Sequence, residues 1–377
     1  MKIAIDVTRA VVETAGIGRY IRDLTHHLLD LDRENEYIIY STHFRDSGSK
    51  RAIFESFKRK NSTLKRWRLP GLFKEILWTF PVNWLSLMGI KADVHFSTSI
   101  FEVGAGFKLP QVLVIYDMTT FLFPQQRGEK ISESLNKRTA RVCRTACKII
   151  CISKSTKRDL YRFVNLPESK AVAIYPGLTG FKKTARVLPS NLKSGEYVLS
   201  VGTIEPRKNL EGLFAAFALL DEKIKKSFPL TIVGGKGWRD AKIYEKAKPL
   251  EEKGHLKFLG FVSDETLAKL YKETAVFVFT SLYEGFGFPA VEAMSFGRPV
   301  ICSNISSLPE AGGEAALLVN PKSPDSIARA IQKVLTEEKL RNKMAKLSLA
   351  QAKKFDWDKT ARQVLEILKS CARKEAA

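Results

Sequence analysis

Two glutamates bracket a glycine-containing turn in the C-terminal half of the sequence. Glu284 and Glu292 lie eight positions apart in EGFGFPAVE, and Gly287 between them lets backbone N–H groups approach a ligand closely. Pro289 suits the first turn of a helix, so we expect the amides of residues 286–290 to point at an anion. The pattern predicts a phosphate site, with ribose hydroxyls bound by Glu292 and sugar hydroxyls bound by Glu284. The alternative is a capped helix with two solvated glutamates.

A pair of cations follows another strand of the same half. Arg207 and Lys208 come after the apolar segment EYVLSVGT and the short loop IEP. This is the carboxyl end of a predicted strand, where ligands of doubly wound sheets bind. Two fixed cations there suit a diphosphate, because they stabilise the negative charge that grows on the bridging oxygen when a nucleoside diphosphate leaves. Taken alone, the pair is typical of an ordinary solvated loop.

Strands and helices alternate along the chain and supply the framework for both groups. The chain opens with the apolar strand KIAIDV, a glycine loop and the amphipathic helix RYIRDLTHHLLDLD. Further apolar strand segments are predicted at 37–42, 92–98, 111–117, 148–153 and 170–177. Strands that alternate with helices in this way predict an α/β fold with a parallel, doubly wound sheet.

The alternation restarts after the polar stretch GLTGFKKTARVLPSNLKSG, with EYVLSVGT as the first strand of a second series. We therefore predict two Rossmann-like, doubly wound domains that face each other across a cleft. Residues 1–185 form the first domain and residues 190–352 the second. Residues 353–377 contain an amphipathic helix that follows the complete second domain, and we expect it to cross back to the first.

The chain carries a net charge of +22, from 62 basic and 40 acidic residues, which favours anionic partners. The basic residues are spread along the chain without a zinc finger, an RNP-type motif or a basic tail, so we expect no nucleic-acid partner. A phosphate-bearing substrate or an anionic membrane surface fits better. Solubility or thermal adaptation is the competing explanation for much of the lysine.

The apolar segments and the cysteines bear on location and metal binding. No apolar run reaches the roughly eighteen residues of a spanning helix, and the start MKIAIDVTRA is not a signal peptide, so a cytoplasmic protein is expected. The five cysteines show no zinc-ribbon spacing, which fits a reducing compartment and predicts buried thiols at Cys143, Cys147 and Cys151. No histidine has a partner at metal-ligand spacing, so no metal site is predicted.

One segment combines cations with aromatic and aliphatic side chains. This is KRWRLPGLFKEILWTFPVNWLSLMG, residues 65–89. A membrane-surface helix has this composition, and it would place the protein in peripheral contact with an anionic membrane at its inner face. A core helix with a basic face is the alternative.

The cation pair and the glutamate pair fit different parts of one nucleotide sugar. The segments VGTIEPRKNL and FTSLYEGFGFPAVEAMSFGRPVICSNISSLPEAGG are very similar to motifs of the retaining glycosyltransferases of family 4, within the bacterial mannosyltransferase-like subgroup. AGIGRYIRDL, YDMTTFLFP, CISKSTKRDL and FDW also have counterparts there, so the resemblance extends over nearly the whole chain. It implies the GT-B fold, with the acceptor mainly in the first domain and the donor in the second.

The resemblance also implies a role for each matching residue. Glu284 would contact the hydroxyls of the donor sugar, Glu292 would hold the ribose, and Arg207 with Lys208 would neutralise the diphosphate. The remaining matches are the amides around Phe286, Gly287 and Phe288, the glycine loop with Gly16 and Gly18 near the donor phosphates, and Asp117 near the reacting sugar.

Two positions depart from the family pattern. Tyr116 precedes Asp117 where relatives usually carry His, which bears on the donor preference or the rate. Thr203 stands at a donor-site position where many relatives have Arg, which leaves Arg207 to supply that charge.

The predicted activity is hexose transfer with retention, from a nucleoside diphosphate sugar to a saccharide or lipid-linked glycan in cell-surface polysaccharide synthesis. GDP-mannose is the donor that the subgroup resemblance favours. We expect no cofactor and no metal, because Arg207, Lys208 and the helix amides offset the diphosphate charge and no Asp-x-Asp motif adjoins the site. The alternatives are another GT-B enzyme, such as a phosphorylase or epimerase, and a catalytically weak sugar-nucleotide or glycolipid-binding protein.

Overall fold

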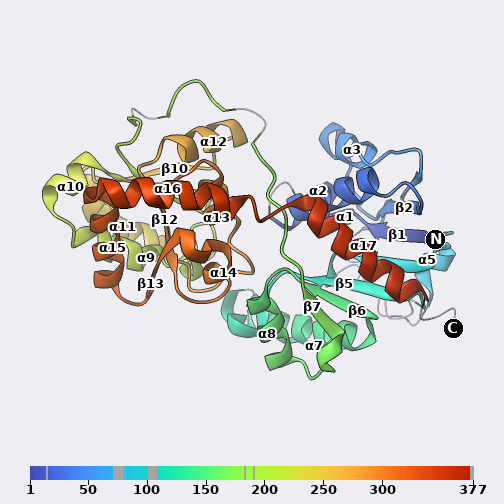
Figure 1. Cartoon of the computed structure of the whole chain (residues 1–377). Coiled ribbons are helices and arrows are strands. Elements are labelled where there is room, and N and C mark those ends of the chain that lie inside the picture. The colour runs from blue at the N-terminus through green and yellow to red at the C-terminus, as the bar shows by residue number, and fades with distance from the viewer. Residues whose placement is uncertain are drawn as a thin grey trace. The chain divides into compact units, whose positions relative to one another are not determined.

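The computed structural model describes residues 1–13, 16–70, 80, 82–100, 108–126, 128–181, 184–189 and 192–373. The chain divides into two compact units (Figure 1). The first comprises Met1–Gly177 together with Asp356–Ala377, and the second comprises Leu178–Phe355.

The first unit is built on a parallel sheet of seven strands in the order β3-β2-β1-β4-β5-β6-β7. Every residue of β4 and β5 is buried. Strands of a parallel sheet are covered on both faces, which is why β5 is mostly apolar, whereas β4 also buries the polar residues His95 and Ser97. The strands are β1 (Lys2–Asp6), β2 (Glu36–Ser41), β3 (Ser62–Arg66), β4 (Val94–Ser97), β5 (Gln111–Ile115), β6 (Lys148–Cys151) and β7 (Ala171–Ala173).

Helices connect these strands and cover the sheet. α8 shows how the sequence starts such a helix: the Ser153 hydroxyl accepts a hydrogen bond from the Thr156 amide at 2.9 Å and so caps the helix. The α-helices of the first unit are α1 (Thr8–Val12), α2 (Ile17–Leu31), α3 (Gly48–Glu55), α5 (Trp84–Leu87), α6 (Thr119–Leu122), α7 (Glu129–Thr145), α8 (Lys154–Phe163) and α17 (Trp357–Arg373).

The last helix, α17, belongs to the first unit although the whole second unit precedes it in the chain. Its buried residues Ala361, Val364 and Leu368 recur at three-to-four spacing, so one face of the helix is apolar. This helix packs on α2 and also contacts β4, β5 and β6. The Thr360 hydroxyl donates to the Tyr175 carbonyl at 2.7 Å, which fixes the start of the helix beside the segment that follows β7.

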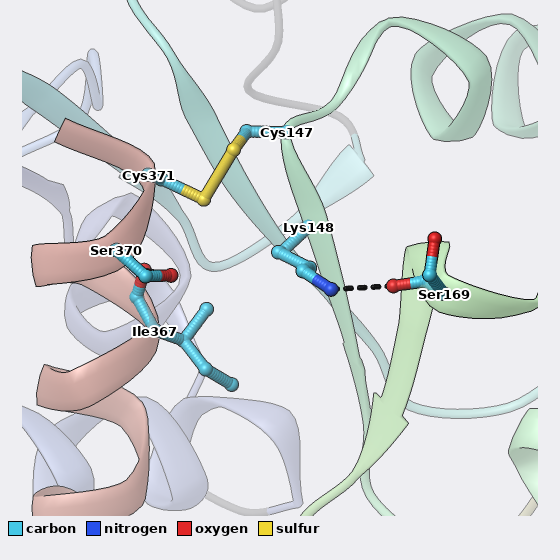
Figure 2. Close-up of a disulfide and its surroundings, with 6 residues drawn as sticks. All are labelled: Cys147, Lys148, Ser169, Ile367, Ser370 and Cys371. Carbon is cyan, nitrogen blue, oxygen red and sulfur yellow. Dashed lines mark hydrogen bonds between the residues drawn. A yellow bond between two sulfur atoms is a disulfide. The ribbon is translucent and has the colours of Figure 1, made fainter. Parts of the chain in front are cut away.

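A disulfide joins Cys147 to Cys371 and fastens the end of α17 to the start of β6 (Figure 2). The prediction of a free, buried thiol at Cys147 is therefore wrong. The partner lies 224 positions away, and only the return of α17 to the first unit brings the two Cα atoms to 6.1 Å. Cys143 and Cys151 are free and buried, as predicted, and burial raises the pKa of the Cys143 thiol to about 12.

The second unit contains a parallel sheet of six strands in the order β10-β9-β8-β11-β12-β13. The strand order reverses between β8 and β11, so this boundary is a topological switch point, where ligands of open α/β sheets bind. The strands are β8 (Val198–Val201), β9 (Leu230–Val233), β10 (Leu256–Gly260), β11 (Val276–Phe279), β12 (Val300–Ser303) and β13 (Ala316–Val319).

The strand order determines which face of the sheet each helix of the second unit covers. Strand-to-strand crossovers are right-handed, so the connections through α9 and α11 cover one face of the sheet and those through α12 and α13 cover the other. In agreement, α9 contacts α11 and α15, while α13 contacts α12 and α16. The helices are α9 (Leu210–Ala218), α10 (Glu222–Ser227), α11 (Ala241–Glu252), α12 (Asp264–Glu273), α13 (Phe288–Ser295), α14 (Leu308–Gly312), α15 (Pro324–Thr336) and α16 (Glu338–Ala352).

The predicted membrane-surface segment 65–89 lies partly outside the described residues, because residues 71–79 and 81 are not described. Its two ends belong to β3 and α5. Within the described part of the chain, no helix combines the length and the apolar character needed to cross a membrane.

Candidate functional site

The loop after β8 carries the two predicted cations and is anchored at the switch point. A short 3-10 helix, Pro206–Lys208, ends at Asn209, whose φ of 56° is left-handed. The side-chain amide of Asn209 donates through Nδ2 to the backbone carbonyls of Thr280 at 3.1 Å and Pro321 at 2.7 Å. Thr280 directly follows β11, so these bonds tie the loop after β8 to the strand on the other side of the switch point.

Arg207 and Lys208 both bind the first glutamate of the predicted pair. Arg207 Nη1 donates to Glu284 Oε2 at 3.0 Å and to the Tyr283 carbonyl at 2.7 Å. Lys208 Nζ donates to Glu284 Oε1 at 2.7 Å. The side chains of Arg207 and Lys208 are 15% and 12% exposed, so these are largely buried ion pairs. The structure thus brings together residues that are 76 and 77 positions apart in the sequence.

A second carboxylate, Glu205, belongs to the same group and was not predicted. Arg207 Nη2 donates to Glu205 Oε1 at 2.6 Å, and Glu205 is buried. Glu205 stands two positions before Arg207 in IEPRK, and this proximity is the sequence signal that could have indicated the ion pair. The four groups carry two positive and two negative charges, so the cluster is close to neutral and holds both cations in fixed positions.

The electrostatics of the cluster keep Glu284 ionised. Burial raises the pKa of this carboxyl group, but the charges of Lys208 and Arg207 and the hydrogen bond from Lys208 outweigh that effect, and the net result is a lowered pKa. Each carboxylate oxygen has two acceptor sites. Glu284 can therefore hold both cations and still accept a hydrogen bond from a hydroxyl group of a ligand.

Two serines fix the backbone of the turn that begins at Glu284. The Ser306 hydroxyl accepts from the Glu284 amide at 3.0 Å and donates to the Glu284 carbonyl at 2.7 Å. Ser307 donates to the carbonyls of Glu284 and Phe286, both at 2.9 Å. Ser306 itself has a left-handed φ of 59°. These serines follow β12, so the turn is positioned by the loop after the neighbouring strand, a support that was not predicted.

The turn ends at Gly287, directly before α13. Gly287 has a φ of 113°, and a Cβ atom at this position would lie 2.6 Å from Leu308 Cδ2. The positive φ favours glycine here, and any larger residue would also require the Leu308 side chain to shift. α13 starts with Phe288 and Pro289, and its first N–H groups have no acceptor within the helix. Pro289 therefore lies in the first turn of a helix, as predicted, and the rings of Phe286 and Phe288 are in edge contact with their centroids 5.2 Å apart.

Glu292 lies in the second turn of α13 and is 8% exposed. Its Oε2 accepts a hydrogen bond from the Tyr271 hydroxyl at 3.0 Å. Tyr271 belongs to α12, so the carboxylate is held from the neighbouring helix. Thr203, also predicted, is exposed in the loop after β8.

The other predicted residues belong to the first unit. Gly16 is the N-cap of α2 with a φ of 55°, and Gly18 is buried in the first turn, where a Cβ atom would collide with the Glu13 carbonyl. Asp117 is exposed after β5, and its carboxylate accepts from the Thr119 amide at 2.8 Å. Asp117 thus follows β5 closely, whereas the short helix α1 separates β1 from the glycine loop, a helix that was not predicted.

Tyr116, which replaces the usual histidine, is tied down within the first unit. Its hydroxyl donates to the Thr98 carbonyl at 2.9 Å. Its ring makes an edge contact with Tyr20 at 5.1 Å, and Tyr20 in turn contacts Trp357 of α17 at 5.3 Å. Burial raises the pKa of the Tyr116 hydroxyl well above its usual value, so this group is a neutral hydrogen-bond donor.

Comparisons with known proteins identify the family to which the chain belongs. Residues 183–349 match the family model "Glycosyl transferases group 1". The chain is 32% identical to O-antigen chain mannosyltransferase B of Escherichia coli over 278 residues, which cover 71% of this chain and 73% of that protein. A 176-residue stretch is 37% identical to the serotype-specific mannosyltransferase WbdA of Escherichia coli and covers 45% of this chain but 21% of WbdA. The chain belongs to the group 1 glycosyltransferases, within the bacterial mannosyltransferase-like group.

Solved structures with little sequence similarity share the fold. Sucrose-phosphate synthase from Thermosynechococcus elongatus matches with a TM-score of 0.75 at 20% identity, over 98% of both chains. Anabaena HepE in complex with UDP-glucose matches with a TM-score of 0.72 at 18% identity, over 98% of this chain and all of the other. The predicted GT-B fold, with two Rossmann-like units, is confirmed, and the chain is a glycosyltransferase.

Proposed function

We propose that this glycosyltransferase moves a hexose, with retention of the anomeric configuration, from a nucleoside diphosphate sugar to a saccharide or lipid-linked glycan. GDP-mannose is the first candidate donor and cell-surface polysaccharide the product, since the relatives above are O-antigen and serotype-specific mannosyltransferases. HepE, which shares the fold, binds UDP-glucose, so UDP-sugars are the alternative donors.

The observation that carries the proposal is the cluster of Arg207, Lys208 and Glu284 at the switch point. The two cations are fixed before any ligand binds, with donor–acceptor distances of 2.7 and 3.0 Å to the same carboxylate. Preorganised charges stabilise a developing anion without a reorganisation cost at the moment of reaction. A nucleoside diphosphate leaving group develops such an anion on the oxygen of its β-phosphate.

The transfer itself needs positioning more than covalent chemistry from the protein. The bond between the anomeric carbon and the β-phosphate oxygen breaks while the acceptor oxygen bonds to the same carbon on the same face. The proton of the acceptor hydroxyl passes to the leaving phosphate oxygen. Arg207 and Lys208 bind that phosphate, the spare acceptor sites of Glu284 orient the sugar hydroxyls, and Glu292 holds the ribose. Gly16, Gly18 and Asp117 of the first unit serve the phosphates and the acceptor side.

We infer that protein cations, rather than a bound metal, compensate the diphosphate charge. Among the described residues, no group of three or more His, Cys, Asp or Glu side chains is arranged to hold a metal ion. The charge that a metal ion would supply is available from Arg207, Lys208 and the N–H groups at the start of α13. Binding of the donor in EDTA tests this point directly.

Calorimetric titration with GDP, UDP and their sugars, with and without EDTA, tests the donor site. We expect one nucleoside diphosphate to bind in the presence of EDTA. Lys208→Met should lower its binding affinity about 10- to 100-fold, because one charge-assisted hydrogen bond is lost. Lys226→Met is the matched control, because Lys226 is exposed on α10 of the same unit. If Lys208→Met and the control bind the nucleoside diphosphate with equal affinity, the assignment of Lys208 to the donor site is wrong.

Retention is tested separately, with the donor that binds best. The products formed with a saccharide acceptor are followed by NMR from the first minutes, and the anomeric coupling of the new bond is compared with that of the donor. A product with inverted configuration would contradict the mechanism but leave the donor site intact.

A further inference from the structure

The segment FDW, Phe355–Trp357, joins the second unit to α17, and the transfer chemistry above does not use it. Phe355 is the last residue of the second unit, and Asp356 is the first residue of the part of the chain that returns to the first unit. Phe355 is 7% exposed and Trp357 is 5% exposed. Segments that join compact units are usually exposed and flexible, so two buried rings at this place call for an explanation.

Phe355 packs on the turn that begins at Glu284, residues 284–287, which we name the donor turn. Its ring makes an edge contact with the ring of Phe286, and the two centroids lie 5.1 Å apart. Phe286 is 2% exposed, and its backbone carbonyl accepts the hydrogen bond from Ser307. Ser307 therefore holds the backbone of the donor turn, and Phe355 holds a side chain of it. Without the Phe355 ring, a cavity beside Phe286 would allow the turn and its N–H groups to shift.

Trp357 packs on two tyrosines of the first unit. Its ring contacts the ring of Tyr20, with the centroids 5.3 Å apart, and Tyr20 contacts Tyr116 at 5.1 Å. Asp356, between the two buried rings, caps α17, because its Oδ1 accepts a hydrogen bond from the Lys359 amide at 2.9 Å. The cap fixes the backbone from which Trp357 extends.

The other crossing of the chain between the units, Gly177–Leu178, fixes the backbone of the same segment. The Leu178 amide donates to the Phe355 carbonyl at 3.0 Å. A Cβ atom on Gly177 would lie 2.3 Å from Cγ of Trp357, so glycine is needed for this close approach. These contacts leave the backbone between the two rings little freedom. Chains of packed side chains on such fixed backbone can carry energetic coupling from one site to another.

We propose that Phe355 and Trp357 are positioning residues for the transfer. Phe355 sets the position of the donor turn, and Trp357 sets the position of Tyr116 through Tyr20. Because the two rings are two positions apart on a fixed backbone, a nucleoside diphosphate that orders the donor turn also orders the start of α17 and Tyr20. This assignment rests on the proposed function.

The first test measures nucleotide affinity by calorimetry, with the full-length protein and its Phe355→Leu variant. The probe is whichever of GDP and UDP the wild type binds more tightly. Displacement of the donor turn should cost about one hydrogen bond to the probe, so Phe355→Leu should weaken binding about 5- to 10-fold. Phe258→Leu is the matched control, because the Phe258 ring packs on Phe214 and Tyr244 in the core of the same unit. The control should bind the probe like the wild type.

Hydrogen exchange separates positioning from a purely structural role. At saturating nucleotide, backbone amides at the start of α17 and around Tyr20 should exchange more slowly in the wild type than without nucleotide. This protection should be lost in saturated Phe355→Leu and kept in Phe258→Leu. Trp357→Leu should keep the nucleotide affinity of the wild type and lose the protection around Tyr20.

Three results would overturn the assignment: no protection in the wild type, full protection in Phe355→Leu, or equal nucleotide affinities of Phe355→Leu and Phe258→Leu. The first of these needs no variant, so the proposal can fail even if Phe355→Leu does not fold. In each case weaker binding by Lys208→Met leaves the proposed function standing. If the wild type binds neither nucleotide, the proposed function fails and this assignment fails with it.

Discussion

Replacing Glu284 by glutamine tests whether the buried ion pairs hold the candidate site together. The substitution keeps the shape and one acceptor oxygen but removes the charge that binds Arg207 and Lys208. Arg207 retains its bond to Glu205 at 2.6 Å, whereas Lys208 loses a carboxylate partner at 2.7 Å. The Lys208 ammonium group then has the Phe279 ring, 5.1 Å away, as a weaker partner.

The size of the effect follows from burial and geometry. The Glu284 side chain is 11% exposed, so solvent screens its two ion pairs only weakly. Removing one partner of a fully buried pair costs about 3–5 kcal/mol, because the other charge is left uncompensated. Since glutamine still accepts one hydrogen bond and Arg207 keeps Glu205, we expect Glu284→Gln to lower the free energy of unfolding by about 2–4 kcal/mol.

Urea unfolding followed by circular dichroism measures this change. Glu196→Gln is the matched control in the same unit, because Glu196 pairs with Lys193 at 3.6 Å on the surface, where both side chains are more than half exposed. Such a pair contributes about 0–1 kcal/mol. If Glu284→Gln and Glu196→Gln destabilise the protein equally, the inference that the cluster fixes the cations is refuted.

The difference between the wild type and Glu284→Gln should also depend on pH. The pKa of Glu284 is lowered in the folded protein, so its stabilising contribution is fully present above the pKa of an unfolded glutamate, about 4.3. It is lost as the pH falls through the lower, folded pKa. The unfolding free energies of the wild type and Glu284→Gln should therefore converge as the pH falls. A difference that stays constant from pH 7 down to the lowest pH at which the protein folds would contradict an ionised Glu284.

Two further substitutions test the turn and the disulfide. Gly287→Ala should cost about 1–3 kcal/mol in unfolding free energy, because φ is 113° and the new Cβ meets Leu308, whereas Gly235→Ala, with nothing within 4 Å, should have a small effect. Cys371→Ser should cost about 2–5 kcal/mol by opening the long loop closed with Cys147, and reducing agent should then have no further effect. Five rather than three titratable thiols in unreduced, denatured protein would exclude the disulfide.

Much of the fold is visible in the sequence, because buried parallel strands are short apolar runs. β5 is apolar almost throughout, and the predicted segment 111–117 contains all of it. β3 was not predicted, since the edge strand STLKR is polar and only partly buried. A helix boundary also lacks a local signal: α15 ends at Thr336 and α16 begins at Glu338, with no proline or glycine between them.

The cysteines show the limit of reasoning from spacing. Local spacing places Cys143, Cys147 and Cys151 on a helix and a strand, and it predicts burial correctly for the first and third. The pairing of Cys147 with Cys371 depends on a helix that returns to the first unit after 178 intervening residues of the second. No local pattern contains that information.

The sequence by itself determined the parallel α/β architecture, the two successive units and the residue types of the candidate site. Periodicity and glycine or proline signals act over a few neighbouring residues, so these features are encoded locally. Only the tertiary structure decided that Arg207 and Lys208 bind Glu284 and that Glu205 completes the cluster. Sheet order brings the ends of β8 and β11 together across the switch point, and the resulting burial sets the charge state of Glu284, because both distance and desolvation are properties of the packed fold.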